Sequence, residues 1–263
     1  MCKRDADAKA VSPRLFTLDP GNLWEEHICC ALADGDGEHG VRDKKCWLSA
    51  RMEEGLVFRR LEGRGKVFIE YLPAENAWYP IDAADCFHID CLWVAGRFKG
   101  QGYGDRLLES CIAEARSQGK AGITALSSPK KRPYLSDPGY LKHRGFIVAD
   151  TAAPFFELLY LPLQEGAGPH FYPWAKEGRC EEPGMVLYCS PQCPYSLKYA
   201  LLLQQAAAAR GIPFVLHLLT TREEARAAPT PFATYSLFWE GKFVTNEILS
   251  EKKAASLFES LGF

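Results

Sequence analysis

The chain has 263 residues, of which 33 are acidic and 31 basic, for a formal net charge of −2. That length allows one large domain or two smaller ones, and the near-balanced charge without a long basic block excludes nucleic acid as the main partner. No apolar run approaches the roughly 18 residues of a membrane span, and the N-terminus lacks an apolar signal segment. We therefore expect a cytoplasmic protein without membrane contact.

Ten cysteines are scattered through the chain. They lack the regular spacing of a small disulfide scaffold, so we expect most of them to be reduced and buried. Two groupings carry metal-ligand residue types: His27 with Cys29 and Cys30, and Cys86 with His88, which alternate with Asp90 along one strand. Neither has a second pair to complete a tetrahedral site, so we predict no metal.

The first half of the chain alternates strand and helix patterns. We predict a helix through residues 25–32 after the turn at Asp19, and a second helix over 47–52. The glycines in 62–65 predict a hairpin. The expected strands of this part are 14–18, 56–61, 66–72 and 87–94.

A glycine-rich turn joins the strand 87–94 to a helix that ends near Gly119. Gly100, Gly102 and Gly104 occupy every second position, and without Cβ atoms their backbone N–H groups can converge on an anion at the start of the helix. A tight turn without a ligand also needs glycines. From spacing alone, a phosphate cradle and an empty turn remain equal alternatives.

The segment from Val94 to Leu108 resembles the acetyl-CoA-binding motif of the GNAT N-acetyltransferase superfamily, Arg/Gln-x-x-Gly-x-Gly/Ala, with Lys99 in the first position. The resemblance implies an α/β fold with a mixed, mainly antiparallel sheet. It also implies that Trp93, Val94 and Ala95 pair with the pantetheine arm. Asp105 in the first helical turn opposes a pyrophosphate, and we expect Lys99 and Arg106 to offset its charge. The expected acetyl-CoA contacts in the loop are Lys99, Gly100, Gln101, Gly102, Tyr103 and Gly104.

The same resemblance implies direct attack of an amine on the thioester, which needs a base and an oxyanion donor. Asp90 is the first candidate base, then Glu70, then His88, although each also fits a solvated strand residue. The Val94 N–H would hold the oxyanion. Tyr140 lies one residue before the position of the family's acidic tyrosine, which is Leu141 here, so a catalytic and a packing role both remain open.

The acceptor itself is not identified by the sequence. Five acidic residues are candidates for a pocket that binds a cationic amine, although they also fit solvated loop and strand faces. They are Glu70, Glu75, Asp82, Asp85 and Asp90. The predicted partners are acetyl-CoA and a small amine or peptide, and a homodimer is an open alternative to a monomer.

The remaining elements complete the first domain, which we place at residues 11–163. We expect a loop and helix over 134–145, and strands over 122–127, 146–150 and 155–161. Residues 164–184 are rich in glycine and proline without periodicity, which predicts a linker.

A second domain is predicted over residues 185–263. Its patterns give a strand over 185–189, a helix over 195–210, a strand over 213–219 and a hairpin over 232–244. That order is thioredoxin-like. The turn from Cys193 to Ser196 resembles the glutaredoxin active-site turn, with Cys189 four residues earlier, so a monothiol and a structural role remain equal alternatives. By the same resemblance, Pro231 corresponds to a cis-proline.

The two parts together resemble the YoaP-like GNAT proteins. The resemblance implies an acyltransferase, an N-acetyltransferase that uses acetyl-CoA as co-substrate. The alternative is a thiol-redox or thiol-binding protein that works through Cys193 and senses acyl-CoA with its first domain. A binding module with an inactive cofactor site is the third reading, and the intact glycines argue against it.

Overall fold

The computed structural model describes residues 13–28, 31, 33 and 39–263. Its first half is built on a seven-stranded sheet in the order β1-β2-β3-β5-β6-β8-β7. β5 and β6 are parallel and the other neighbouring strands are antiparallel. The strands are β1 (Leu15–Thr17), β2 (Val57–Leu61), β3 (Val67–Pro73), β5 (Cys86–Val94), β6 (Gly122–Ser127), β7 (Ile147–Ala152) and β8 (Phe156–Pro162). The mixed, mainly antiparallel sheet predicted from the sequence is confirmed.

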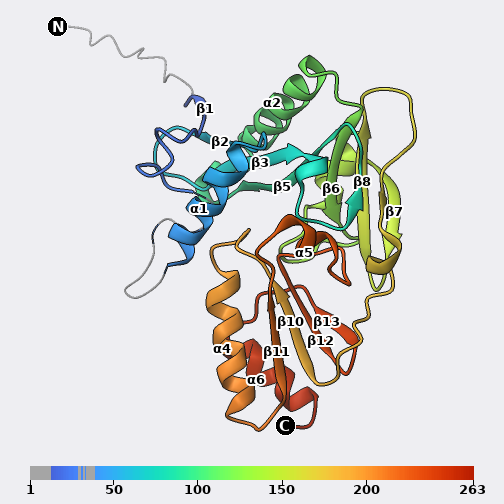
Figure 1. Ribbon diagram of the computed structural model, residues 1–263. Helices are drawn as coiled ribbons and strands as arrows, with labels where there is room; N and C mark the ends of the chain where they lie inside the picture. The colour runs from blue at the N-terminus through green and yellow to red at the C-terminus, as the bar shows by residue number, and fades with distance from the viewer. Residues whose placement is uncertain (1–12, 29–30, 32, 34–38) are drawn as a thin grey trace, which may run out of the picture.

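α2 (Tyr103–Ser117) lies on one face of this sheet, and α1 (Gly40–Met52) and a second unit lie on the other (Figure 1). α2 buries Leu107, Leu108 and Cys111 in the core of the first face, together with Leu141 of α3 (Pro138–His143). The opposite face carries α1 and the C-terminal part of the chain. These two faces belong to separate hydrophobic cores, because successive side chains of a strand point to opposite sides.

The expected helix over 25–32 is not found where the structure describes that segment. Residues 20–26 form turns instead, in which the Asp19 carboxylate accepts from the amides of Gly21 and Asn22 at 2.8 and 3.0 Å. Local bonds of this kind compete with helix formation. Residues 29, 30 and 32 of the expected helix lie outside the described residues.

The C-terminal part contains a four-stranded sheet in the order β11-β10-β12-β13. The predicted strand, helix, strand and hairpin are confirmed, and β10 and β11 are parallel as a connecting helix requires. The elements are β10 (Met185–Cys189), α4 (Ser196–Ala208), β11 (Phe214–Leu218), α5 (Arg222–Arg226), β12 (Tyr235–Trp239), β13 (Lys242–Thr245) and α6 (Glu251–Ser260).

The segment expected to be a linker is tied to the first sheet. β9 (His170–Phe171) pairs with β4 (Ile81–Asp82), and Phe171 is buried. Lys176 forms an ion pair with Asp150 of β7 at 2.7 Å. The pairing of β9 with β4 and the ion pair to β7 therefore hold a stretch whose sequence shows no periodicity.

The two parts share one continuous hydrophobic core, which includes Trp78 and Tyr79 of the first part and Leu187 and Phe232 of the second. Arg226 donates to the Ile81 carbonyl at 3.1 Å across the same junction. Among the described residues, no helix has both the length and the apolar character needed to cross a membrane.

Candidate active site

The central strand β5 has one open edge near its end. β3 pairs with β5 from Cys91 to Val94 and from Phe87 to Ile89, whereas β6 pairs with it only from Cys86 to Ile89. Beyond Ile89 the two parallel strands separate. The edge of β5 between Cys91 and Val94 is thus left without a neighbouring strand on the β6 side.

A β-bulge at Asp90 marks the point of separation. Glu70 pairs with Cys91 and Tyr71 pairs with Ile89, so Asp90 is the extra residue on β5. The Ala95 amide donates to the Lys66 carbonyl at 3.0 Å. Because hydrogen-bonded and non-bonded pairs alternate in an antiparallel ladder, the Val94 N–H points away from β3, toward the open edge.

The glycine-rich loop leads from this edge to α2. Gly100 and Gly102 have φ of +73° and +76°, and a Cβ atom at either position would meet nothing within 4 Å. Those angles favour glycine, and Gly102 is the N-cap of α2. The loop side therefore presents open space and the first N–H groups of α2, which have no partner within the helix. Lys99 and Gln101 are exposed beside it.

Arg144 neutralises the acidic residue in the first turn of α2. Its guanidinium lies 2.5 Å from the Asp105 carboxylate, and this contact is the main cause that lowers the pKa of Asp105. The expectation that Lys99 and Arg106 would offset Asp105 is wrong. Arg106 instead donates to the Pro13 carbonyl and lies over the Tyr103 ring.

Tyr140 lies at the same helix start. Its hydroxyl donates to Asp105 at 3.0 Å, and burial followed by this carboxylate raises the pKa of the tyrosine. The hydroxyl oxygen would also be 3.3 Å from a Cβ at Gly104. Leu141, at the family's usual tyrosine position, is buried in the core under α2.

Glu70 and Asp90 form a buried pair of carboxyls on the face opposite α2. Lys44 of α1 donates to Glu70 at 2.5 Å, with both side chains buried. Burial raises the pKa of Glu70, and the Lys44 ammonium opposes that rise. Burial and then the Glu70 charge raise the pKa of Asp90 well above its ordinary range. Asp90 is therefore the carboxyl of the pair that is poised to hold a proton.

His88 precedes Asp90 on the same face of β5. Its Nδ1 lies 2.8 Å from the Thr124 hydroxyl, and burial lowers the pKa of the ring to about 3. The Tyr79 ring lies beside it, tilted by 50°, with 4.7 Å between ring centroids. The imidazole is consequently neutral at physiological pH.

The five acidic residues proposed as an acceptor pocket do not come together. Only Glu70 and Asp90 share a site, whereas Asp82 and Asp85 are exposed, and Glu75 is exposed and lies 3.6 Å from Lys120. The alternation of side chains along a strand can predict that Glu70 and Asp90 share a face of the sheet. The positions of the other three residues follow no such pattern, so the sequence could not predict them.

The two cysteines of the C-terminal turn differ in environment. Cys189 is buried in β10, and burial raises the pKa of its thiol to about 12. Cys193 is partly exposed and lies three residues before α4. The predicted cis bond before Pro231 is wrong, since the cis peptide bond of the described chain is Ala153–Pro154.

Neither grouping of metal-ligand residue types gathers three ligands within the described residues. His27 contacts the Gly65 carbonyl through Nε2 at 2.9 Å, and Cys29 and Cys30 lie outside the described residues. Cys86 is buried, and His88 is engaged with Thr124.

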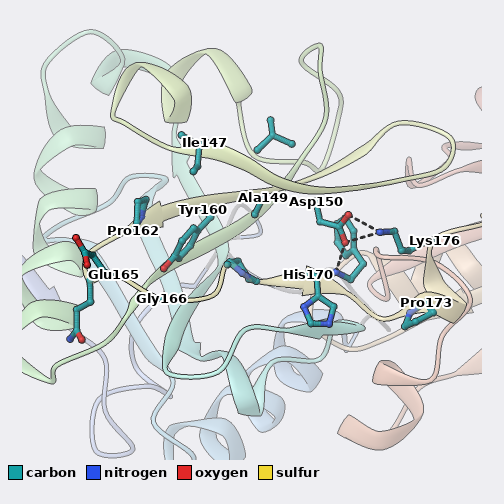
Figure 2. A pocket seen from close by; sticks show the side chains of 15 residues that line it. Ile147, Ala149, Asp150, Tyr160, Pro162, Glu165, Gly166, His170, Pro173 and Lys176 are labelled. Carbon is teal, nitrogen blue, oxygen red and sulfur yellow. Dashed lines mark hydrogen bonds and ion pairs between the residues drawn. The ribbon is translucent and has the colours of Figure 1, made fainter.

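A surface groove of about 950 Å³ lies away from this site, between β7 and the segment 164–176 (Figure 2). Asp150 and Lys176, which form an ion pair, both line it (Figure 2). None of its lining residues belongs to β5 or to the glycine-rich loop.

Sequence reasoning missed Lys44, Tyr79 and Arg144. Lys44 falls three residues after Val41 and four before Leu48, both buried on α1, so helical spacing alone predicts its inward position. Tyr79 and Arg144 carry no such local signal.

Comparisons with known proteins follow the same division of the chain. The model of the Acetyltransferase (GNAT) family matches residues 22–131, and the model described as YoaP-like matches residues 213–254. The uncharacterized N-acetyltransferase YoaP of Bacillus subtilis strain 168 is 44% identical over 241 residues, which cover 91% of this chain and 96% of the relative.

Two solved structures show partial likeness. The ribosomal-protein-S18-alanine N-acetyltransferase of Escherichia coli is 16% identical with a TM-score of 0.40, over 59% of this chain and 96% of that one. A GNAT family acetyltransferase from Brucella melitensis in complex with acetyl-CoA is 17% identical with a TM-score of 0.36, over 62% and 98%.

Proposed function

The chain belongs to the GNAT family of N-acetyltransferases, and from that premise we propose that it transfers the acetyl group of acetyl-CoA to a primary amine by direct attack. The observation that carries the proposal is the open edge of β5 beside the N-terminus of α2. The glycine-rich loop joins this strand edge directly to the helix start. The acceptor is a small molecule or a peptide amine.

Acetyl-CoA fits the residues at this opening. Its pyrophosphate would lie on the first N–H groups of α2, at Gly102, Tyr103 and Gly104, where a helix start favours an anion. Lys99, Gly100 and Gln101 border the same loop. The pantetheine arm would run along Trp93, Val94 and Ala95, whose outer edge β6 leaves unpaired.

Asp90 is the proposed base. An amine enters as the ammonium ion, gives one proton to the ionised Asp90 carboxylate, and attacks the thioester carbonyl. A carbon–nitrogen bond forms, the carbon–sulfur bond breaks, and a second nitrogen proton ends on the departing CoA thiolate. Because the pKa of Asp90 is raised, its ionised form, which alone can accept the proton, becomes more abundant as the pH rises.

Val94 is the proposed oxyanion donor, since its N–H points to the open edge of β5. Tyr140 is a weaker candidate for the acid that protonates the thiolate, because Asp105 already accepts its hydroxyl proton. Glu70 contributes through its charge on Asp90 rather than by contact with the substrate.

The strand order of the C-terminal unit supports a thioredoxin-like description, in which β10, α4 and β11 are followed by an antiparallel hairpin. The thiol-redox reading gains little support. Cys189 is buried with a raised thiol pKa, which disfavours the reactive thiolate. We assign Cys193 no chemical step.

A panel of amines, polyamines, aminoglycosides and peptides tests the function when release of the CoA thiol is followed with the full-length protein. Acetylated product identified by mass spectrometry is the expected result. Binding of acetyl-CoA without transfer to any amine would contradict the proposal.

A further inference from the structure

His88 presents a buried nitrogen that accepts hydrogen bonds. The Thr124 hydroxyl has one proton, and it donates to the Phe87 carbonyl at 3.2 Å. The contact of 2.8 Å between Thr124 and Nδ1 of His88 is then satisfied when Nδ1 carries the proton. That assignment leaves Nε2 of His88 as a bare acceptor, and no described residue donates to it.

Asp90 adds two further acceptors on the same face of β5. Both of its carboxyl oxygens are buried, and among the described residues their one hydrogen-bonding contact is with the Glu70 carboxyl, which exists only while one of the two acids is protonated. Lys44, the nearby ammonium, is directed to Glu70. Buried acceptors of this kind cost free energy unless water or a ligand supplies donors.

The C-terminal unit reaches the residues that flank these acceptors. The ring of Tyr79 lies against His88 at a tilt of 50°, and its centroid is 6.5 Å from that of Phe232. The Tyr79 hydroxyl lies 3.4 Å from the Thr234 hydroxyl. Gln192 extends to the Trp78 carbonyl at 3.5 Å. Side chains of the C-terminal unit therefore contact Tyr79, the ring that lies beside His88.

α1 closes another side. A Cβ at Gly40 would lie 1.9 Å from the Pro194 carbonyl oxygen, so the start of α1 lies directly against the turn before α4. Trp47 and Trp78 meet edge to face at 5.7 Å in the same core. A folded protein has no free face of β5 on which to dock at this point.

We propose that the acceptor of this enzyme is a small cationic amine held at the junction of the two units, with its ammonium donating to Asp90 and to Nε2 of His88. This inference rests on the proposed function and narrows it. Once Asp90 has lost its proton, its two oxygens and Nε2 of His88 form an acceptor set without donors, which three ammonium hydrogens match, and the carboxylate supplies the opposite charge. The C-terminal unit acts as a wall that excludes polypeptide acceptors.

Cys91 provides a probe of this junction that does not depend on turnover. It pairs with Glu70 across the two strands, so the two side chains lie on one face, and it is partly exposed. We would compare its modification by a small cationic methanethiosulfonate, an anionic one of similar size, and a maleimide attached to polyethylene glycol. Peptide mapping would follow Cys91, with exposed Cys46 as the internal reference.

Relative to Cys46, the cationic reagent is expected to modify Cys91 at pH 8.5 at least about tenfold faster than the anionic one, which corresponds to about 1.4 kcal/mol. The polyethylene glycol reagent should leave Cys91 unmodified. Asp90→Asn should remove most of the charge preference, and Asp82→Asn, at an exposed site, should keep it. Rapid labelling by the large reagent, equal labelling by both charges, or no labelling by any reagent would overturn the inference.

Measurements of acetyl transfer provide a second, independent test of the acceptor class. n-Butylamine should be acetylated in preference to a tripeptide with a free N-terminus, and a folded protein should not be acetylated. Transfer to the folded protein would refute the narrow acceptor class while supporting acetyl transfer. Absence of acetyl-CoA binding in calorimetry would instead refute the proposed function. The labelling of Cys91 would then still show whether the junction admits small cations.

Discussion

Lys44 and Glu70 form a buried ion pair between α1 and β3, with 2.5 Å between Nζ and Oε1. Removal of one partner leaves the other as an uncompensated buried charge. Lys44→Met is therefore expected to lower the free energy of unfolding by about 3–5 kcal/mol, measured by urea denaturation. Lys45→Met, at the next and more exposed position, is the matched control and should change it by less than about 1 kcal/mol.

The double variant Lys44→Met/Glu70→Leu removes both charges. It should recover much of the lost stability, because a buried ion pair contributes little beyond an apolar pair of similar volume. Equal destabilisation by the single and double variants would show that the packing of Lys44, rather than its charge, holds the two elements together.

Asp90 should make stability depend on pH. Burial raises the pKa of its carboxyl in the folded state, so its contribution to stability is present below the ordinary pKa of about 4 and is lost as the pH rises toward the raised value. Asn cannot lose a proton. Asp90→Asn is expected to gain thermal stability relative to the wild type at pH 8 and to show a smaller difference at pH 4.

The exposed residue Asp82 offers the control for that experiment. Asp82→Asn should follow the pH dependence of the wild type. A loss of stability in Asp90→Asn that is the same at pH 4 and pH 8 would rule out titration of this carboxyl as the cause.

Gly102 tests the binding of acetyl-CoA. Gly102→Asp places a side chain and a negative charge at the start of α2, at a φ of +76° that favours glycine, so calorimetry should detect no acetyl-CoA binding. Gly211→Asp introduces the same side chain at a φ of +69°, also in open space, but in the C-terminal unit. Normal affinity in a folded Gly102→Asp variant would place the pyrophosphate elsewhere.

Cys193 tests whether the second unit takes part in the chemistry. Direct transfer requires no acyl-cysteine, so Cys193→Ser should keep turnover within about threefold, less than 1 kcal/mol in activation free energy. An acetyl group trapped on Cys193 by mass spectrometry, or loss of transfer while acetyl-CoA still binds, would instead indicate a covalent relay.

Local patterns predicted most of the fold but only part of the site. The strand, glycine-rich turn and helix around Gly102 follow from alternation, helical spacing and the conformations open to glycine. The same approach failed at 25–32, where Asp19 and Asn22 form turns that compete with a helix. The pairing of Arg144 with Asp105, and of Tyr79 with Thr234, joins residues distant in sequence. Such contacts depend on tertiary packing and leave no periodic signal.

The kinetics of Asp90→Asn test the account most directly. The substitution keeps the shape of the side chain and removes its ability to accept a proton, with Asp82→Asn as the control. Once an acceptor amine is found, the rate of CoA release at saturating acetyl-CoA should fall by about 10²–10⁴-fold, while calorimetry should show unchanged acetyl-CoA affinity. The wild-type rate should rise with pH through the raised pKa of Asp90, and that rise should disappear in the variant. Unchanged kinetics in Asp90→Asn would contradict the assignment of the base and transfer that role to Glu70, His88 or water.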